Sequence, residues 1–322
     1  MSARSGFIAP AIFSILVLFL FGELSIRLLF SKYVGVTSDE RNQLYRYDEE
    51  LGWFPIQNCD KTYKGFRLIH THHNNKGFRD VDHWKKKKPR IIFIGDSYVW
   101  GYDVEAEELF TELLKPQFPG WEILNLGVSG YGTDQELMLL ERYIDEYDPE
   151  ILFLIFCSKN DHFDNSVNVN YGGYYKPYYI TEGTKLVRSG VPVPRSYNYY
   201  INQFPLLFKS YFIRGLFKVY ARLALPERIV NDDPTEKILI AMKELVESRG
   251  AQFHIGLTDP EHDGEEISFL KDNDFNFIDL SNDSTYPIHR HWKPTGHQLA
   301  SKLLVEYLKV AIAQTQYQAQ RN

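Results

Sequence analysis

From residue 90 onward, short apolar runs alternate with amphipathic segments, and this alternation constrains the fold of the 322-residue chain more than any other feature. The apolar runs cover residues 91–94, 122–126, 151–157, 252–257 and 275–280, and helical periodicity covers residues 106–118, 133–147, 235–248 and 295–313. Strands that alternate with helices form a parallel sheet covered on both faces. We therefore expect a three-layer α/β/α, doubly wound, flavodoxin-like fold.

Two further features of the sequence indicate the ends of the second predicted helix, residues 133–147. Thr133 and Glu136 have the spacing of a capping box, and Pro149 ends the segment. The alternation breaks only at an insertion of about residues 163–232, which is rich in tyrosine and contains an amphipathic stretch at residues 204–223. The eight tyrosines between residues 171 and 200 indicate packing within a hairpin, with a sugar-stacking lid as the alternative.

The amino terminus, residues 1–30, predicts a membrane anchor. Residues 5–22 carry no charge, and as a helix these 18 residues would extend ~27 Å, close to the thickness of the bilayer core. Glu23 and Arg27 follow at a spacing that allows an ion pair. No small-residue cleavage site stands out, which favours an uncleaved anchor over a removed signal peptide.

The charges around this span bear on its orientation. Arg4 precedes it, and a larger group of basic residues follows: Arg27, Lys32, Arg41 and Arg46. By the positive-inside rule alone, the domain would lie in the cytoplasm. Residues 31–89 are polar with little periodicity, so we expect an ordered extension rather than a separate domain, followed by one α/β domain over residues 90–322.

Composition excludes several classes of function. The net charge of −6 argues against a general nucleic-acid binder. Only Cys59 and Cys157 are present, so neither a disulfide framework nor a cysteine metal site is expected. His72 and His73 have no third ligand at a convincing spacing, and the chain has no phosphate-binding loop or dinucleotide fingerprint. We expect no cofactor and no metal.

Polar residues follow three of the predicted strands. The sequence reads GDS at residues 95–97, NLGVSG at 125–130 and SKND at 158–161, and HRHWKPTGH at 289–297 precedes the last helix. The carboxyl ends of parallel strands meet at one edge of the sheet, so these side chains should converge. A serine with a histidine base, a glycine-rich turn and an asparagine amide is a set that acyl transfer requires.

These four blocks, in this order, resemble the SGNH, or GDSL-type, hydrolase superfamily. The resemblance implies that Ser97 is the nucleophile, that Gly130 and Asn160 stabilise the oxyanion, and that His291 is the general base. The string GDSYVWGYDV, together with NNKGFRD at residues 74–80, is similar to a membrane-anchored bacterial branch. That branch implies an inner-membrane protein with a single span and its catalytic domain outside the cytoplasm.

Two positions depart from the family pattern. The family usually places an aspartate two or three residues before the catalytic histidine, where this chain has His289 and Ile288. Three groups are therefore candidates for orienting His291: Asp283, His289 and a backbone carbonyl. Ser158 stands where the third block often has glycine. Asp96 is interpreted as part of the turn and not as the acid of a triad.

Three functions follow from this interpretation. The first is a serine esterase that removes a small acyl group, such as acetyl, from a small molecule or a cell-envelope glycan. The second is a polysaccharide O-acetyltransferase that uses the same residues. The third is a non-catalytic glycan-binding relative, which the missing aspartate favours and the intact Ser97, Asn160 and His291 oppose.

Overall fold

A five-stranded, wholly parallel sheet forms the centre of the computed structural model, which describes residues 5–35, 41–82, 85–171, 173–259, 264–288 and 290–319. Its strand order is β6-β5-β7-β12-β13, which in chain order is the 2-1-3-4-5 arrangement of flavodoxin-like folds. The predicted fold class is confirmed. The strands are β5 (Arg90–Gly95), β6 (Glu122–Asn125), β7 (Ile151–Phe156), β12 (Gln252–Leu257) and β13 (Asn276–Asp279).

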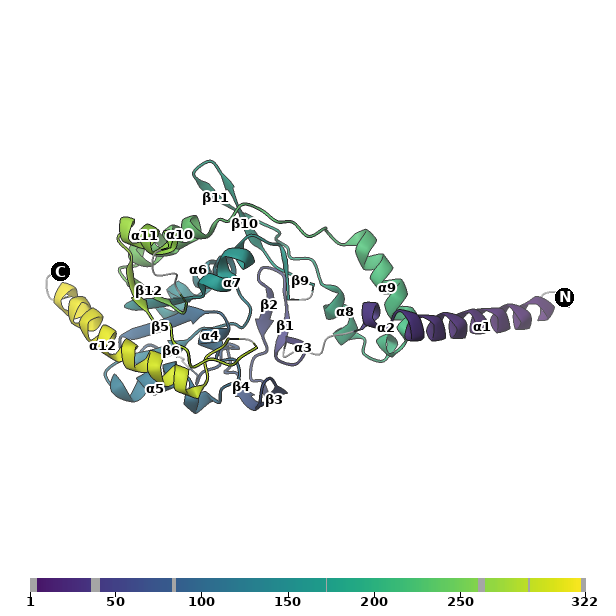
Figure 1. Ribbon diagram of the computed structural model, residues 1–322, viewed down its shortest axis with the longest axis horizontal. Helices are drawn as coiled ribbons and strands as arrows, with labels where there is room; N and C mark the ends of the chain where they lie inside the picture. Colours follow the sequence, from purple (N-terminus) through teal and green to yellow (C-terminus); the bar gives the residue numbers. More distant parts are fainter. Residues whose placement is uncertain are drawn as a thin grey trace.

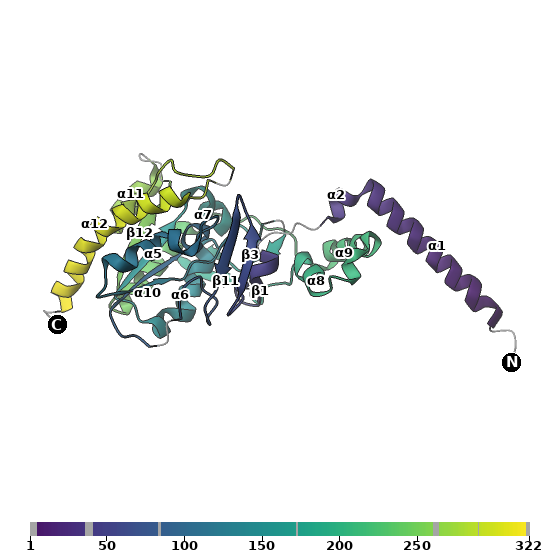
Figure 2. The same ribbon diagram turned by 90° about the horizontal axis from the view of Figure 1, so that it is seen from below.

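Helices cover both faces of the sheet, so β5 and β7 are buried along their whole length. Ile92 and Ile94 belong to the apolar cluster that includes α6 (Thr133–Tyr147) and α10 (Thr235–Ser248). Ile91 and Phe93 belong to the opposite cluster, with α5 (Phe110–Leu114) and α12 (Pro294–Ala319). Figure 2 shows these two helix pairs on opposite sides of the sheet.

Two local predictions are wrong. The expected helix at residues 106–118 is divided into η1 (Ala106–Glu108), α5 and η2 (Lys115–Gln117), because Leu109 takes an extended backbone with ψ of 139°. The expected capping box is absent from α6, because Gly132 and not Thr133 occupies the N-cap position. Thr133 then lies in the first turn and the Glu136 side chain is fully buried, so neither can cap the helix.

The extension packs onto the sheet as two hairpins. These are β1 (Tyr45–Asp48) with β2 (Gly52–Pro55), and β3 (Asp60–Lys64) with β4 (Leu68–His72). Trp53, Phe54 and Tyr63 share one buried cluster with Ile92 and Leu152 of the sheet. The extension therefore contributes to the same hydrophobic core as the sheet.

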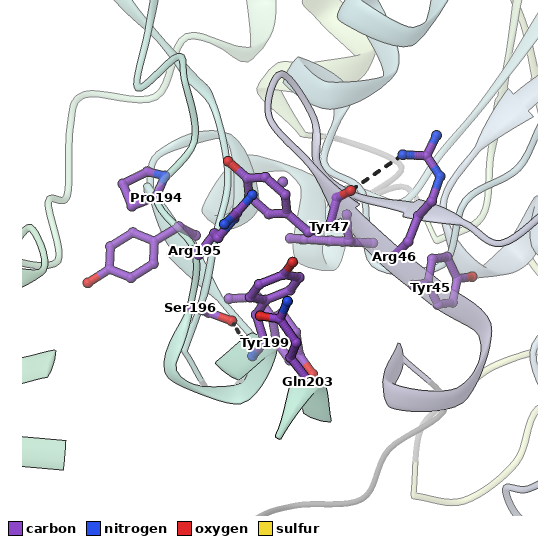
Figure 3. Close-up of a pocket in the computed structure, with 12 residues that line it drawn as sticks. Tyr45, Arg46, Tyr47, Pro194, Arg195, Ser196, Tyr199 and Gln203 are labelled. Atoms are coloured by element: carbon purple, nitrogen blue, oxygen red, sulfur yellow. Dashed lines mark hydrogen bonds between the residues drawn. The ribbon is translucent and has the colours of Figure 1, made fainter. Parts of the chain in front are cut away.

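The insertion leaves the sheet after α7 (Ser158–Asn165). It contains β8 (Val169–Asn170), β9 (Tyr174–Tyr175), the hairpin of β10 (Tyr178–Glu182) with β11 (Lys185–Ser189), α8 (Tyr197–Gln203), η3 (Leu207–Lys209) and α9 (Tyr211–Ala224). Only some of its tyrosines lie in the hairpin: Tyr178 and Tyr179 do, whereas Tyr199 and Tyr200 lie on α8. Strand β9 and helix α8 meet the β1–β2 hairpin at a pocket (Figure 3).

The amino-terminal helix α1 (Ser5–Leu29) projects away from the body of the molecule, with α8 and α9 between them (Figures 1 and 2). Its segment Ile8–Leu29 is long and apolar enough to cross a membrane, and none of it is buried. A signal sequence has the same character. The expected ion pair is present, with Arg27 Nη2 lying 2.8 Å from Glu23 Oε1. The short helices α2 (Ser31–Val34) and α3 (Arg41–Leu44) lie between α1 and β1.

Candidate active site

The candidate residues lie at the carboxyl ends of β5 and β7, on either side of the point where the strand order reverses. Ser97 follows β5, and Asn160 follows β7. Ligands bind at this switch point in open α/β sheets because the neighbouring connections leave on opposite faces. A pocket of about 550 Å³, here called the Ser97 pocket, is lined by Ser97, Gly130, Asn160 and His291 among others. The structure thus brings these four residues together.

A tight turn presents Ser97. Asp96 is the N-cap of the single-turn helix α4 (Ser97–Trp100), and its Oδ1 accepts a hydrogen bond of 2.9 Å from the Tyr98 backbone N–H. Gly95 permits the turn, because a Cβ there would lie 2.5 Å from Val99 Cγ2 and 2.9 Å from the Ile155 carbonyl oxygen. The chain can therefore leave the sheet sharply enough to place the serine at its edge.

His291 reaches Ser97 from a distant loop. Its Nε2 lies 2.7 Å from Ser97 Oγ, which is hydrogen-bond distance between a nucleophile and a base. Arg290, immediately before it, has a positive φ of 56°, an uncommon conformation that tends to persist at functional sites. The loop is held because the Tyr98 hydroxyl donates to the Arg290 carbonyl at 2.8 Å, and the His291 ring lies beside Tyr102 at 4.7 Å between centroids.

Gly130 and Asn160 provide polar hydrogens in the Ser97 pocket. Gly130 has φ of 81°, in the left-handed region that glycine tolerates. No hydrogen bond to its N–H is formed within the described residues, so this donor is available to a ligand. Asn160 Nδ2 donates to Asp96 Oδ2 at 3.2 Å and to Asp164 Oδ2 at 3.3 Å. The amide is therefore positioned by two carboxylates.

Neither of the two residues named as candidates for orienting His291 is among the described residues that line the Ser97 pocket. Asp283 lines a neighbouring pocket of about 340 Å³, together with Lys159, Arg290 and Trp292. His291 lines the Ser97 pocket instead. His289 lies outside the described residues. The role of either residue stays a prediction.

Buried carboxyl groups form a cluster near Asn160, and the sequence motifs did not indicate that these groups would be buried together. They are Asp96, Asp134, Glu136, Asp161 and Asp164. Burial raises the pKa of Asp96 to about 6 and the pKa of Asp134 to about 6, because water no longer stabilises their charge. Burial likewise raises the pKa of Glu136 and of Asp161 well above the usual range. Part of this cluster is therefore protonated near neutral pH.

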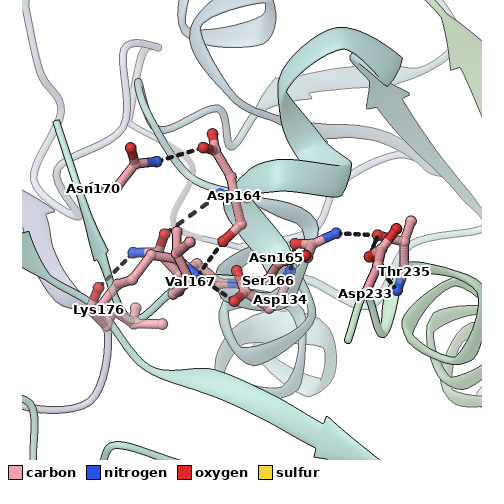
Figure 4. Close-up of polar contacts among 12 residues, drawn as sticks. Asp134, Asp164, Asn165, Ser166, Val167, Asn170, Lys176, Asp233 and Thr235 are labelled. Atoms are coloured by element: carbon pink, nitrogen blue, oxygen red, sulfur yellow. Dashed lines mark hydrogen bonds and ion pairs between the residues drawn. The ribbon is translucent and has the colours of Figure 1, made fainter. Parts of the chain in front are cut away.

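Lys176 supplies the balancing charge (Figure 4). Its ammonium group pairs with Asp134 and donates to the Asp164 backbone oxygen at 2.8 Å. Asn170 Nδ2 donates to Asp164 Oδ1 at 2.6 Å. These bonds fix the carboxyl-terminal turn of α7, so Asp164 can in turn hold Asn160. The sequence contained one indication of the contact between Asn160 and Asp164: the two residues are four positions apart and so share a helix face. Nothing in the sequence placed Lys176 beside it.

No family model and no curated protein matches the sequence. Solved structures do match. The chain is similar to GDSL-type hydrolases. One match is the psychrotrophic esterase EstA from Pseudoalteromonas sp., with 12% identity and a TM-score of 0.41, covering 70% of this chain and 100% of that one.

Two further matches are of the same kind. The lipase/acylhydrolase from Enterococcus faecalis has 12% identity and a TM-score of 0.40, covering 70% of this chain and 97% of that one. The acetyl xylan esterase AlAXEase has 12% identity and a TM-score of 0.37, covering 68% and 98%. Likeness at this level concerns the fold and transfers no activity, so the function of this chain has to be argued from its own site.

Proposed function

We propose that this protein is a serine esterase that forms an acyl intermediate on Ser97. The observation that carries the proposal is the 2.7 Å separation of Ser97 Oγ and His291 Nε2. It occurs in a pocket that also contains the Gly130 backbone and the Asn160 amide. A serine that was only a turn residue would need neither a histidine at hydrogen-bond distance nor oxyanion donors around it.

The chemistry proceeds in two steps. Ser97 Oγ attacks the ester carbonyl while His291 Nε2 accepts the hydroxyl proton, and the carbonyl oxygen becomes an oxyanion. As the intermediate collapses, His291 returns the proton to the leaving alcohol and an acyl-Ser97 ester remains. Water then attacks this ester with the same proton transfer, releasing the carboxylic acid and restoring Ser97.

The oxyanion is stabilised by three donors: the N–H groups of Ser97 and Gly130 and the side-chain amide of Asn160. In the structure both N–H bonds of Asn160 Nδ2 are directed to Asp96 and Asp164. One of them has to turn to the oxyanion. A protonated Asp96 would weaken its hold on the amide and reduce repulsion of the developing charge, and the raised pKa of Asp96 makes this form accessible.

The group that orients His291 is proposed to be Asp283 or His289. Asp283 carries the charge that would stabilise an imidazolium, and the loop that bears it is joined to the histidine loop by the bridge between Thr285 and Trp292. Comparison of Asp283→Asn with His289→Gln would identify the partner. Substitution of the true partner should lower the rate of acylation, whereas the other substitution should leave this rate unchanged.

The substrate is proposed to be a small acyl ester, such as O-acetyl on a cell-envelope glycan. Transfer of the acyl group to a polysaccharide hydroxyl is the second candidate. Its support is the low exposure of Ser97, at 7%, because restricted access of water to the acyl-enzyme slows hydrolysis. The third candidate, a non-catalytic glycan-binding relative, is opposed by the contact between Ser97 and His291.

We place α1 as a single span of the inner membrane with the catalytic domain outside the cytoplasm. The length and apolar character of Ile8–Leu29 support a span, and the resemblance to the anchored branch supports the orientation. An alkaline phosphatase fused after Asn322 would be active in cells if the domain is exported. An inactive fusion that is stably expressed would contradict this orientation.

A fluorophosphonate probe tests the catalytic proposal directly. Purified full-length protein should be labelled stoichiometrically, and peptide mapping should place the label on Ser97. Absence of labelling would leave the non-catalytic function. Addition of a sugar acceptor during turnover of p-nitrophenyl acetate then separates the two enzymes: a transferase yields acetylated sugar, whereas an esterase yields only acetate.

A further inference from the structure

A second pocket, of about 490 Å³, lies between the β1–β2 hairpin and the insertion (Figure 3). We call it the aromatic pocket. Its walls come from the hairpin on one side, and from β9, the loop before α8 and α8 on the other. Six aromatic side chains line it: Tyr45, Tyr47, Trp53, Tyr174, Tyr175 and Tyr199. A cavity of this size accommodates a small-molecule ligand or a few sugar units.

The aromatic pocket is positively charged. Arg46 and Arg195 line it, and no aspartate or glutamate does so among the described residues. The Arg195 guanidinium lies 4.9 Å from the Tyr47 ring centroid and 5.1 Å from the Tyr199 ring centroid. The guanidinium thus lies beside both rings, whose centroids are 5.3 Å apart, and these contacts restrict it while leaving N–H groups for an anion. Arg46 is less available, because Asp48 Oδ2 lies 3.8 Å from it.

The remaining groups suit a hydroxylated ligand. Tyrosine rings offer flat apolar faces together with hydroxyl groups, and Gln203 and Ser196 add an amide and a hydroxyl group to the lining. A planar guanidinium binds a carboxylate through two parallel hydrogen bonds. We propose that the aromatic pocket binds a carboxylate-bearing sugar unit of an acidic polysaccharide. This proposal deepens the esterase function given above and rests on it for the identification of the polymer as substrate.

The aromatic pocket and the Ser97 pocket are separated by a thin wall. Trp53 lines the aromatic pocket, and its Nε1 donates to the Ser129 carbonyl at 3.2 Å. The Trp53 ring also lies 6.3 Å from that of Tyr171. Ser129 and Tyr171 both line the Ser97 pocket. The two pockets are therefore neighbours on the molecule, so a polysaccharide with one unit held by Arg195 can present another, acylated unit to Ser97.

Binding of oligosaccharides tests this site without turnover. The full-length Ser97→Ala protein in nanodiscs is titrated with a panel of short acidic oligosaccharides, their neutral counterparts and glycerol phosphate, an anion with no sugar ring. We expect acidic oligosaccharides to bind preferentially. Arg195→Gln added to this background should weaken binding by about tenfold or more, the usual worth of a hydrogen bond to a charged group. Arg195→Lys, which keeps the charge without the planar fork, should be intermediate.

Arg188→Gln is the matched control. It removes one arginine from the same insertion, at the β10–β11 hairpin, where Arg188 pairs with Glu141 outside the aromatic pocket. Equal binding of acidic and neutral oligosaccharides, or equal loss in the Arg188 and Arg195 variants, would overturn the proposal, as would glycerol phosphate competing as well as the sugars. If wild-type protein fails to hydrolyse esters but the preference for acidic sugars holds, only the esterase proposal fails.

A second inference concerns α9, which packs against the proposed membrane span. Phe212 of α9 contacts Phe19 of α1, with ring centroids 5.4 Å apart. Glu23 Oε2 accepts hydrogen bonds of 2.8 Å from Ser210 Oγ and from the Phe212 backbone N–H. Gly215 allows close approach, because a Cβ there would lie 2.8 Å from Ile26 Cδ1. The two helices are therefore fixed to one another.

This contact determines the depth of α9. Phe19 lies three residues before the end of the uncharged stretch at Gly22, which corresponds to ~5 Å along the helix. A side chain that touches Phe19 is then within the bilayer if α1 crosses it. The exposed apolar residues of α9 have the spacing of one helix face: Leu216, Val219, Tyr220 and Leu223. Basic residues lie between them at Lys218 and Arg222.

We infer that α9 lies in the membrane interface, with this apolar face in the acyl-chain region and its basic side chains at the phospholipid headgroups. The bilayer then covers a surface that would otherwise expose Leu223 to water at 82% of its area. The helix would hold the aromatic pocket close to the membrane, since α8 and α9 are joined only by η3 and its flanking residues.

Single-cysteine labelling measures this depth. An environment-sensitive fluorophore is attached at Leu216→Cys, Leu223→Cys or, as a control, at Lys185→Cys on the exposed β10–β11 hairpin; native Cys59 and Cys157 are buried. In nanodiscs, the two α9 positions should show blue-shifted emission that spin-labelled lipids quench, and the hairpin position should show neither. Emission at positions 216 and 223 that matches position 185 would overturn the inference.

Discussion

The Ser97 pocket takes its residues from the ends of sheet strands and the loop before the last helix, whereas the aromatic pocket takes its residues from a hairpin and an insertion. In the first, Ser97 and Asn160 follow two adjacent strands, so the sheet itself places them side by side. In the aromatic pocket, the ring centroids of Tyr47 and Tyr199 lie 5.3 Å apart although the two residues are distant in the sequence. A regular sheet makes a site predictable, and packing between irregular segments does not.

The two pockets also differ in the charged residues that line or support them. Five buried carboxyl groups and one buried lysine support the Ser97 pocket. The aromatic pocket has two arginines and no acidic lining among the residues that the structure describes. This difference suits the roles proposed for the two pockets, since catalysis would require a polar group held in place and polysaccharide binding would require attraction of an anion.

The largest expected effect separates catalysis from polymer binding. Ser97→Ala should lower turnover of p-nitrophenyl acetate by at least about 10³-fold, because the nucleophile is lost and only oxyanion stabilisation remains. Binding of acidic oligosaccharides should persist in the same variant. Steady-state kinetics and calorimetry on one preparation measure both quantities. Retained hydrolysis would remove Ser97 from the mechanism, and lost binding would show that the two pockets are not separable.

Asn160→Ala should have the next largest effect. Loss of one oxyanion donor lowers kcat by about 10²–10³-fold while KM changes little. The variant also leaves Asp96 and Asp164 without the amide that joins them. Fluorophosphonate labelling of Ser97 shows whether the nucleophile remains intact in this variant. An unchanged kcat would exclude Asn160 from the oxyanion site.

Trp53→Ala should affect both pockets through stability. The indole is only 2% exposed and donates to the Ser129 carbonyl, so its removal leaves a cavity and an unpaired acceptor. We expect a loss of about 3–5 kcal/mol in the free energy of unfolding, measured by urea titration with circular dichroism. Leu68→Ala, at an exposed strand position, is the control and should change it by less than about 0.5 kcal/mol. A similar small change for Trp53 would mean that the wall between the pockets is not part of the core.

The smallest expected effect concerns the pH dependence that Asp96 contributes. Its pKa rises from 3.8 to about 6 on folding, so between these values the folded protein binds more protons than the unfolded chain. Stability from this group is therefore present at low pH and falls as pH rises to about 6.

Asp96→Asn removes this dependence. The difference in unfolding free energy between wild type and variant should decrease by up to about 3 kcal/mol from pH 4 to pH 7. Thermal or urea unfolding of both proteins across this range provides the comparison. A difference that is constant with pH would show that the Asp96 pKa is not raised.

Much of the fold could be predicted because its signals are local. The bounds of α6, α10 and β12 match the periodicity at residues 133–147, 235–248 and 252–257. The prediction of one helix over residues 106–118 was wrong because an apolar face does not reveal that Leu109 interrupts the helix with an extended backbone. The capping box failed because Glu136 is drawn into the core, and sequence spacing does not distinguish a buried carboxyl from a capping one.

The sequence by itself determined the parallel α/β sheet, the apolar amino-terminal helix, and the position of Ser97 and Asn160 at one sheet edge, since strand ends converge wherever strands run parallel. Tertiary structure decided what lies around them. The contact of His291 with Ser97 depends on a loop held by Tyr98, and the pairing of Lys176 with Asp134 depends on the path of the insertion. The aromatic pocket exists only because the β1–β2 hairpin meets α8. Such contacts join residues far apart in the chain, and their geometry is fixed by packing in three dimensions rather than by any local preference of the backbone.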